Sequence, residues 1–198
     1  MTSLSGVLYN HVLYRLLYTA QLSSNRCFAM NSTPQVSVLF VCLGNICRSP
    51  TAHGIFEALV RDAGLDGWIR VDSAGTGDWH IGKSPDKRAM AAALGRGLDI
   101  GHLIARQVRP SDFDQFDYIL AMDRSNLSNL ERMRPPSFAG HLGLFLPFAA
   151  YAGQPLETDE VPDPYYGEAG GFQHVYELVE QAARGLLAHI SQHHPRSI

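Results

Sequence analysis

The sequence contains few cysteines and no dense cluster of positive charge. Its three cysteines are an odd number, and Cys42 and Cys47 lie five residues apart, so they do not form the disulfide framework of a small secreted domain. This usage predicts a reducing compartment, the cytoplasm. Lys and Arg (16) are fewer than Asp and Glu (19) and gather nowhere into a basic stripe, which argues against a nucleic-acid partner.

The nine histidines show neither an H-E-x-x-H motif nor a Cys/His spacing typical of zinc, so we expect no metal and no cofactor. The chain also lacks an apolar run of membrane length. Leu and Val recur at helical spacing in residues 4–17, but Asn10, His11 and Arg15 interrupt them. We therefore expect no membrane span.

The first 35 residues differ from the rest because they contain no acidic residue. We predict that residues 1–35 are an N-terminal extension, disordered or dispensable, most of which a start at Met30 would remove. A docked helix and a targeting segment are the alternatives, since the segment is Leu-rich and weakly basic. The remaining residues, 36–198, have enough apolar content for one globular domain with a sizeable core.

The domain is organised around the stretch V-S-V-L-F-V-C-L-G-N-I-C-R-S-P at residues 36–50. An apolar, β-branched run ends at Cys42, and a loop through Gly and Asn leads into a pattern of helical period. The stretch therefore predicts a strand, a tight loop and a helix N-terminus. Ser49 is predicted to cap this helix, and Pro50 to be its first residue.

The N–H groups of such a loop converge beside the positive end of a helix dipole, which favours a phosphate dianion. Arg48 adds a planar fork of donors that can bind two phosphate oxygens. Cys42 lies at the foot of this cradle, where the positive surroundings favour a reactive thiolate. The alternative for Cys42 is a small buried hydrophobic side chain, and the alternative for Arg48 is a pair with a carboxylate.

Further strands and helices alternate along the chain. Strands are expected at residues 68–71, 117–122 and 141–146, helices at 84–97, 124–132 and 172–190, and a loop at 72–83. This order predicts an α/β three-layer sandwich, with a four-stranded parallel sheet, helices on both faces and the phosphate-binding loop after the first strand. Ligand is then expected at the C-terminal ends of the strands, near the switch in strand order.

Several motifs in this order resemble the low-molecular-weight protein tyrosine phosphatases over about residues 36–192. They are the loop described above (residues 42–50) and the motifs D-S-A-G-T (72–76), W-H (79–80), R-Q (106–107), A-M-D (121–123) and D-P-Y-Y (163–166). The resemblance implies a metal-independent phosphotyrosine phosphatase that acts through a phosphocysteine intermediate. Its partner would be a phosphotyrosine-containing protein or an aryl phosphate, with phosphate as product and competing ligand.

The chemistry of the loop makes Cys42 the expected nucleophile and Arg48 the expected clamp on the transition state. The departing oxygen needs a proton, and the resemblance implies that Asp163 supplies it. An ordinary turn residue is the alternative for Asp163, because two prolines flank it. The predicted phosphate-binding set is Leu43, Gly44, Asn45, Ile46, Cys47, Arg48 and Ser49.

Other residues of the predicted site have supporting roles. Ser49 can donate a hydrogen bond to the Cys42 sulfur. Asn45 is expected in a turn with positive φ, where the resemblance implies that its side chain braces the loop. Asp123 is expected first to cap a helix and second to brace the loop. Cys47 is predicted to trap oxidised Cys42 as a disulfide, with plain packing as the alternative.

Trp79, Tyr165 and Tyr166 are expected to form the walls of a slot for the flat ring of phosphotyrosine, with ordinary cover of the core as the alternative.

Protein arginine phosphatases resemble this chain but have a Thr where Ile46 stands and lack the paired tyrosines. An arsenate reductase on the same fold needs further cysteines in the middle of the domain. A non-catalytic phosphopeptide-binding module is expected to lack the nucleophile or the acid. These features favour phosphotyrosine hydrolysis.

Overall fold

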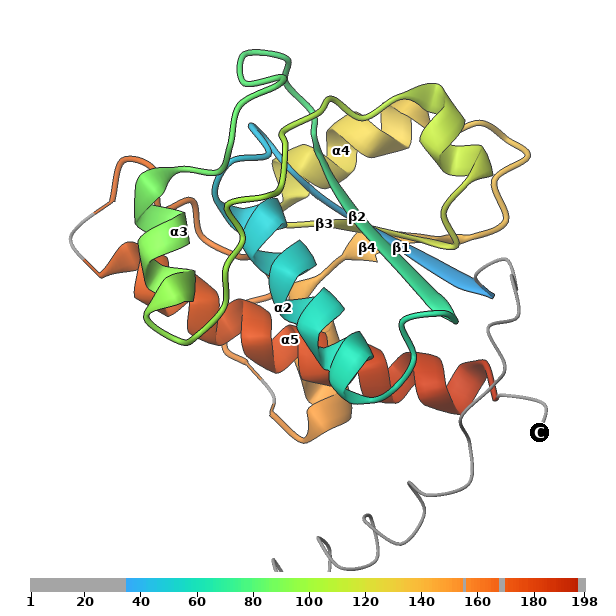
Figure 1. Ribbon diagram of the computed structural model, residues 1–198. Coiled ribbons are helices and arrows are strands. Elements are labelled where there is room, and N and C mark those ends of the chain that lie inside the picture. Colours follow the sequence, from blue (N-terminus) through green and yellow to red (C-terminus); the bar gives the residue numbers. More distant parts are fainter. Residues whose placement is uncertain (1–34, 155, 168–169, 196–198) are drawn as a thin grey trace, which may run out of the picture. The chain divides into compact units, whose positions relative to one another are not determined.

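Strand β1 (Val36–Cys42) lies inside a parallel sheet in the computed structural model, which describes residues 35–154, 156–167 and 170–195. In this part of the chain four strands have the order β2-β1-β3-β4, with β2 at Ile69–Gly75, β3 at Tyr118–Ala121 and β4 at His141–Leu144 (Figure 1). All three strand pairs are parallel. The predicted extension, residues 1–35, lies outside the described residues except for Gln35.

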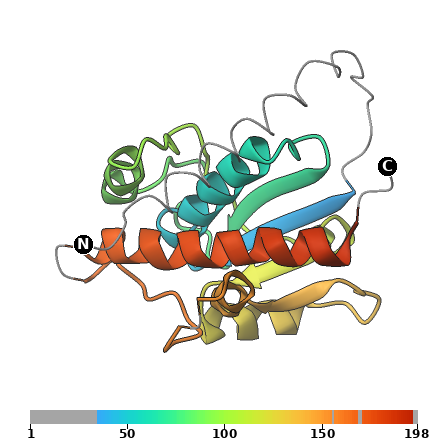
Figure 2. The same ribbon diagram turned by 90° about the horizontal axis from the view of Figure 1, so that it is seen from below.

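Helices form a layer on each face of the sheet. One layer contains α2 (Arg48–Asp62) and α5 (Gly171–His193), with α3 (Lys87–Leu94) beside them and the 3-10 helix η2 (Leu146–Ala152) packed against α5. The other layer contains α4 (Arg124–Met133) and the 3-10 helix η1 (Pro110–Asp114). Figure 2 shows α5, in red, running across one face of the sheet. The predicted α/β three-layer sandwich with a parallel sheet is confirmed.

The sequence of β1 is almost entirely apolar because both faces of the strand are covered. All seven of its residues are buried. Val38 and Phe40 face the core shared with α2 and α5, whereas Leu39 and Val41 face the core shared with α4. The ring of Phe40 meets the ring of Phe145 edge-on at a centroid separation of 4.8 Å, which ties the strand to the start of η2.

The strand order places a switch point at the C-terminal end of β1. After β1 the chain adds β2 on one side of it, and then β3 and β4 on the other side. The connections that leave β1 and β3 therefore run to opposite faces of the sheet. The crevice between them, which begins at Cys42, is the usual place for a ligand in such sheets. This position matches the expectation from the sequence.

The second strand is longer than predicted. Residues 72–75, which we expected in a loop, continue β2 and pair in parallel with residues 39–42 of β1. The sequence there is polar and contains Gly, so local strand propensity is low. Hydrogen bonds to the neighbouring strand override that propensity. The prediction of a loop from residue 72 was therefore wrong for these four residues.

Other boundaries also differ from the predictions, most of them by one to three residues. Helix α3 begins at Lys87 and not at residue 84, because the side chain of Asp86 caps it by accepting a hydrogen bond of 2.8 Å from the Arg88 N–H. The fourth strand ends at Leu144, and the apolar residues after it form η2. Within the described ranges, no helix has the length and apolar character that crossing a membrane requires.

The close packing of α5 on η2 depends on Gly185. A Cβ atom at this position would lie 1.8 Å from the carbonyl oxygen of Phe148, which is backbone and cannot rotate away. We therefore expect Gly185→Ala to destabilise the protein by about 1–2 kcal/mol, although Ala is favoured over Gly inside a helix by about 1 kcal/mol. The midpoint of thermal unfolding should fall by roughly 2–8 °C.

The matched control is Gly67→Ala, because Gly67 has no positive φ and no described atom lies within 4 Å of a Cβ built there. This variant should unfold within about 1 °C of the wild type. An unchanged or higher midpoint for Gly185→Ala would show that α5 and η2 separate without cost, and would contradict the close contact.

Candidate active site

The phosphate-binding loop predicted from the sequence connects the end of β1 to the start of α2. Asn45 has a φ of 55°, as predicted, and it is the single residue other than glycine with positive φ in the described part of the chain. This conformation turns the loop back, so that the Asn45 N–H donates to the Cys42 sulfur at 3.2 Å. The loop is thereby folded around the thiol, which is nearly buried.

Ser49 does not cap α2, so this prediction was wrong. The helix begins at Arg48, two residues before Pro50, which we expected to be its first residue, and the hydroxyl of Ser49 lies beneath the loop. There it lies 3.1 Å from the Cys42 sulfur and can donate to the carbonyl of Ala74 at 3.2 Å. A hydroxyl has a single proton, so the carbonyl and the sulfur compete for it. A negatively charged sulfur is the stronger acceptor and would draw the proton toward itself.

The side chain of Asn45 is the centre of a buried hydrogen-bond network. Its amide group donates to Ser49 at 2.9 Å and to Ser73 at 3.0 Å, and its oxygen accepts from the Arg106 N–H at 2.9 Å. Ser73 in turn contacts His53, and burial lowers the pKa of His53. Ser73 and Arg106 belong to motifs that carry the family resemblance, but no local pattern assigns them this role.

Neighbouring segments hold the loop through its backbone carbonyls. Gly77 donates its N–H to the carbonyl of Leu43 at 2.8 Å, and Asp86 donates to the carbonyl of Ile46 at 2.7 Å. Gly75 lies so close that a Cβ atom there would be 2.8 Å from the Leu43 oxygen, so only glycine fits without a shift of the backbone. The D-S-A-G-T motif thus supports the loop from the adjacent strand.

Arg48 is 3% exposed and its guanidinium is shared by three acceptors. It donates to Asp123 at 2.5 Å, to the carbonyl of Val161 at 3.1 Å and to Asp163 at 3.1 Å. The other oxygen of Asp123 accepts from the Asn126 N–H at 2.7 Å, which caps α4. Asp123 therefore has both of the roles considered from the sequence. Arg48 does pair with carboxylates, inside the predicted site.

Asp163 lies in a short loop whose backbone is fixed at both ends. Before it, Val161 donates its N–H to the carbonyl of Met122, just after β3, at 2.7 Å. After it, the Tyr165 N–H donates to the Asp163 carboxylate at 3.1 Å. The Asp163 side chain is 43% exposed, in contrast to the buried Arg48. A carboxyl group in this position can exchange protons with solvent and reach a group bound above the loop.

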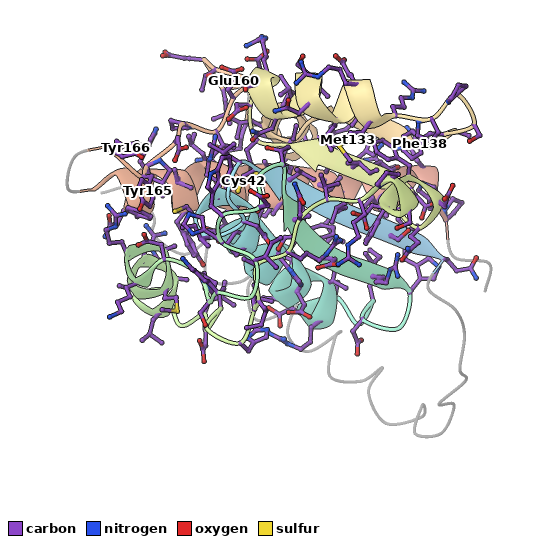
Figure 3. The ribbon with its side chains drawn as sticks, turned by 90° about the horizontal axis from the view of Figure 1, so that it is seen from above. Cys42, Met133, Phe138, Glu160, Tyr165 and Tyr166 are labelled. Atoms are coloured by element: carbon purple, nitrogen blue, oxygen red, sulfur yellow. The ribbon has the colours of Figure 1, made fainter. Side chains whose placement is uncertain are left out.

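The predicted nucleophile, clamp, acid and aromatic residues line one cavity of about 480 Å³, a size typical of small-ligand sites. Tyr165 and Tyr166 contact each other edge-on at 4.8 Å, and Figure 3 shows both toward the same end of the sheet as Cys42. Asn45 and Ser49 lie beneath the loop. The lining residues are Cys42, Leu43, Gly44, Ile46, Cys47, Arg48, Trp79, His80, Asp163, Tyr165 and Tyr166.

Cys47 has different surroundings from Cys42, although it lies in the same loop. Burial, with a smaller contribution from the nearby Asp86 carboxylate, raises the pKa of the Cys47 thiol to about 12. Cys47 is thus a neutral thiol at neutral pH, whereas the Cys42 sulfur has an N–H and a hydroxyl beside it. In the part of the chain that the structure describes, no group of three His, Cys, Asp or Glu side chains is placed to hold a metal ion.

A family model described as low molecular weight phosphotyrosine protein phosphatase matches residues 37–196. Low molecular weight phosphotyrosine protein phosphatase of Schizosaccharomyces pombe is 45% identical over 145 residues, which are 73% of this chain and 90% of that protein. Low molecular weight protein-tyrosine-phosphatase YfkJ of Bacillus subtilis is 41% identical over 157 residues, which are 79% of this chain and 97% of that protein.

Solved structures agree with the sequence comparisons. The crystal structure of YfkJ superimposes with a TM-score of 0.75 at 39% identity, covering 83% of this chain and 99% of YfkJ. A Drosophila arginine phosphatase, DARP, superimposes with a TM-score of 0.69 at 35% identity, covering 81% and 99%. Since the family model spans the whole described α/β unit and both relatives are covered almost completely, this chain belongs to the low molecular weight phosphotyrosine protein phosphatase family.

Proposed function

We propose that this enzyme hydrolyses phosphotyrosine in proteins, and related aryl phosphates, through a phosphocysteine intermediate on Cys42. The observation that carries the proposal is the arrangement within one cavity. The Cys42 sulfur and the buried Arg48 guanidinium lie at its floor, with the Asp163 carboxyl and three aromatic side chains around them. This combination provides a nucleophile, an anion clamp, a proton donor and a surface for an aromatic leaving group.

In the first step the Cys42 thiolate attacks phosphorus. The sulfur–phosphorus bond forms and the bond from phosphorus to the phenolic oxygen breaks, with its electron pair leaving on that oxygen. The Asn45 N–H and the Ser49 hydroxyl stabilise the negative charge on the sulfur before attack. Arg48 and the amides of residues 43–49 bind the phosphoryl oxygens beside the N-terminus of α2, where the helix dipole favours negative charge.

Asp163 gives its proton to the departing oxygen in this step. Its carboxylate contacts Arg48 at 3.1 Å, and a bound phosphoryl group would compete for the same guanidinium. A phosphoryl group that takes over this guanidinium nitrogen leaves the Asp163 carboxyl free to face the departing oxygen. Asp163 then accepts a proton from the water that attacks the phosphocysteine. The sulfur–phosphorus bond breaks, its electron pair returns to sulfur, and phosphate leaves.

The walls of the cavity support phosphotyrosine over phosphoarginine as the substrate. Trp79 and Tyr166 are largely exposed, at 63% and 94%, so their apolar faces are free to cover a ring bound above the loop. Protein arginine phosphatases are one rival class, and the similar Drosophila protein is named as one. Ile46 and the Tyr165–Tyr166 pair distinguish this chain from their pattern.

The same proposal assigns residues 36–198 to the phosphatase domain and treats residues 1–35 as an extension that turnover does not need. It also assigns the enzyme to the cytoplasm, because its three cysteines do not form the disulfide framework of a secreted domain. The catalytic residues proposed above all lie between residues 42 and 166 of the chain.

The nucleophile is tested by Cys42→Ser. A serine hydroxyl is a far weaker nucleophile at neutral pH, so turnover of a phosphotyrosine peptide should fall on the order of 10³-fold or more. Thermal unfolding should stay close to wild type, since the side chains are similar in size. Cys27→Ser is the control, because Cys27 lies in the extension.

Released phosphate should be measured for phosphotyrosine and phosphoarginine, and arsenate reduction should be assayed in parallel. The wild type should prefer phosphotyrosine. A folded Cys42→Ser protein with full activity would end the proposal, and a preference for phosphoarginine or arsenate would replace it with the corresponding rival.

The proton donor is tested by Asp163→Asn, which keeps the shape of the side chain but cannot donate an acidic proton. We expect kcat/KM to fall by about 10²–10⁴-fold for phenyl phosphate, a poor leaving group, and much less for p-nitrophenyl phosphate. Asp159→Asn is the control, because Asp159 pairs with Arg124 outside the lining of the cavity. Equal losses on both substrates for Asp163→Asn would assign the proton to another residue.

A redox role of Cys47 is a separate prediction. Peroxide converts the Cys42 thiolate to a sulfenic acid, and the Cys47 thiol then displaces water to form a disulfide that an added thiol reductant opens. The raised pKa of Cys47 makes this trapping step faster at higher pH. Activity of the wild type should return after reductant, whereas Cys47→Ser should lose activity permanently. Equal recovery, or no Cys42–Cys47 crosslink by mass spectrometry, would leave Cys47 as packing.

A further inference from the structure

Arg88, the second residue of α3, connects this helix to the loop that carries Asp163. Two of its nitrogens donate to the two oxygens of Asp86, at 3.0 and 2.9 Å. A third donates to the backbone carbonyl of Tyr165 at 3.1 Å. The guanidinium also lies over the rings of Tyr165 and Phe172, 5.2 and 4.6 Å from their centroids. One side chain thus joins a carboxylate, a carbonyl and two aromatic faces.

One end of this connection is fixed to the phosphate-binding loop. The Asp86 N–H donates to the carbonyl of Ile46 at 2.7 Å, and the Asp86 carboxylate caps α3. The hydrogen bonds from Arg88 lower the pKa of Asp86, which is therefore ionised at neutral pH. Arg88 and Asp86 form a charged pair whose position is set by the loop that surrounds Cys42.

The other end of the connection reaches the general acid. The Tyr165 backbone donates its N–H to Asp163 and accepts at its carbonyl from Arg88, at 3.1 Å in both cases. A shift of Tyr165 would therefore move the turn that holds the Asp163 carboxyl. The ring of Tyr165, which lines the cavity, would move with it. Figure 3 shows Tyr165 next to Tyr166 at the edge of the site.

We infer that Arg88 is a positioning residue for the phosphatase reaction: it holds residues 163–166 against the phosphate-binding loop, so that Asp163 lies at the leaving oxygen. The inference rests on the proposed function. Half of the Arg88 side chain is exposed, so its ion pair with Asp86 contributes little to stability by itself. The planar guanidinium instead fixes several groups at once. A displacement of about 1 Å at a reacting group can cost about 10²-fold in rate.

Arg96 provides a matched control for a purely structural role. It pairs with Glu177 at 2.7 Å and lies over the Tyr176 ring at 5.0 Å from the centroid. Its side chain is about as exposed as that of Arg88, at 41% compared with 50%. Glu177 and Tyr176 both lie on α5. Neither of them, nor Arg96 itself, is among the residues that line the cavity in the described structure. Arg96 thus shares the types of contact that Arg88 makes but has no route to Asp163.

The experiment compares Arg88→Met, Arg88→Lys and Arg96→Met in the full chain, with phenyl phosphate and p-nitrophenyl phosphate. The value of kcat/KM includes the departure of the leaving group, so the ratio of the two values reports proton donation. For Arg88→Met we expect kcat/KM on phenyl phosphate to fall by about 10-fold or more, and much less on p-nitrophenyl phosphate. Arg88→Lys should recover part of this ratio, since it keeps the charge but not the planar fork.

Arg96→Met should leave the ratio at the wild-type value, while both Met variants should unfold at similar temperatures. The double variant Arg88→Met with Asp163→Asn gives the decisive comparison. If Arg88 acts through Asp163, the ratio for the double variant equals that for Asp163→Asn alone. The inference would be overturned if the change in the ratio for the double variant were the product of the changes for the two single variants. It would also be overturned if Arg88→Met lowered kcat/KM equally on both substrates.

The same measurements separate this inference from the proposed function. If Asp163→Asn changes the ratio and Arg88→Met does not, the positioning role is wrong and the proton donor stands. If Asp163→Asn leaves the ratio unchanged, the assignment of the acid is wrong, and the positioning role of Arg88 is wrong with it.

Discussion

The burial of the Arg48 guanidinium is the constraint on which the rest of the site depends. A charge taken out of water is costly unless paired groups surround it, and Arg48 is 3% exposed. Its acceptors are Asp123, the Val161 carbonyl and Asp163, which follow β3 or lie in the loop before α5. The need to pair one cation therefore brings together three segments that are distant in sequence. The cavity forms where they meet.

Stability and chemistry share the same atoms in this arrangement. Asp123 caps α4 with one oxygen and holds Arg48 with the other, so the helix in one layer orients the cation that begins the helix in the opposite layer. Removal of one partner of a buried ion commonly costs about 3–5 kcal/mol. In the proposed reaction, a phosphoryl group in the cavity would take over part of this pairing from Asp163. Substrate would then use a guanidinium that the fold has already placed and oriented.

Local sequence predicts the parts of the site that depend on neighbouring residues. The bounds of β1, the positive φ of Asn45 and the residues that line the cavity follow from patterns within residues 36–50 and from motifs of the family resemblance. Two of the errors involve partners far away in sequence. The hydroxyl of Ser49 turns from the helix N-terminus toward Ala74, 25 residues away, and residues 72–75 become strand by pairing with β1. Arg88 reaches Tyr165 across 77 residues, with no local signal.

The two cysteines of the loop show why spacing alone could not assign their chemistry. Cys42 lies where the backbone turns back on the sulfur, so an amide and a hydroxyl are available to a thiolate. Cys47 also lines the cavity but is buried with the Asp86 carboxylate nearby, and its pKa is raised to about 12. One loop thus holds two sulfurs with different surroundings: hydrogen-bond donors lie beside the first, and burial keeps the second protonated. The positive φ at Asn45 turns its N–H toward Cys42, whereas burial and the Asp86 carboxylate disfavour negative charge on Cys47.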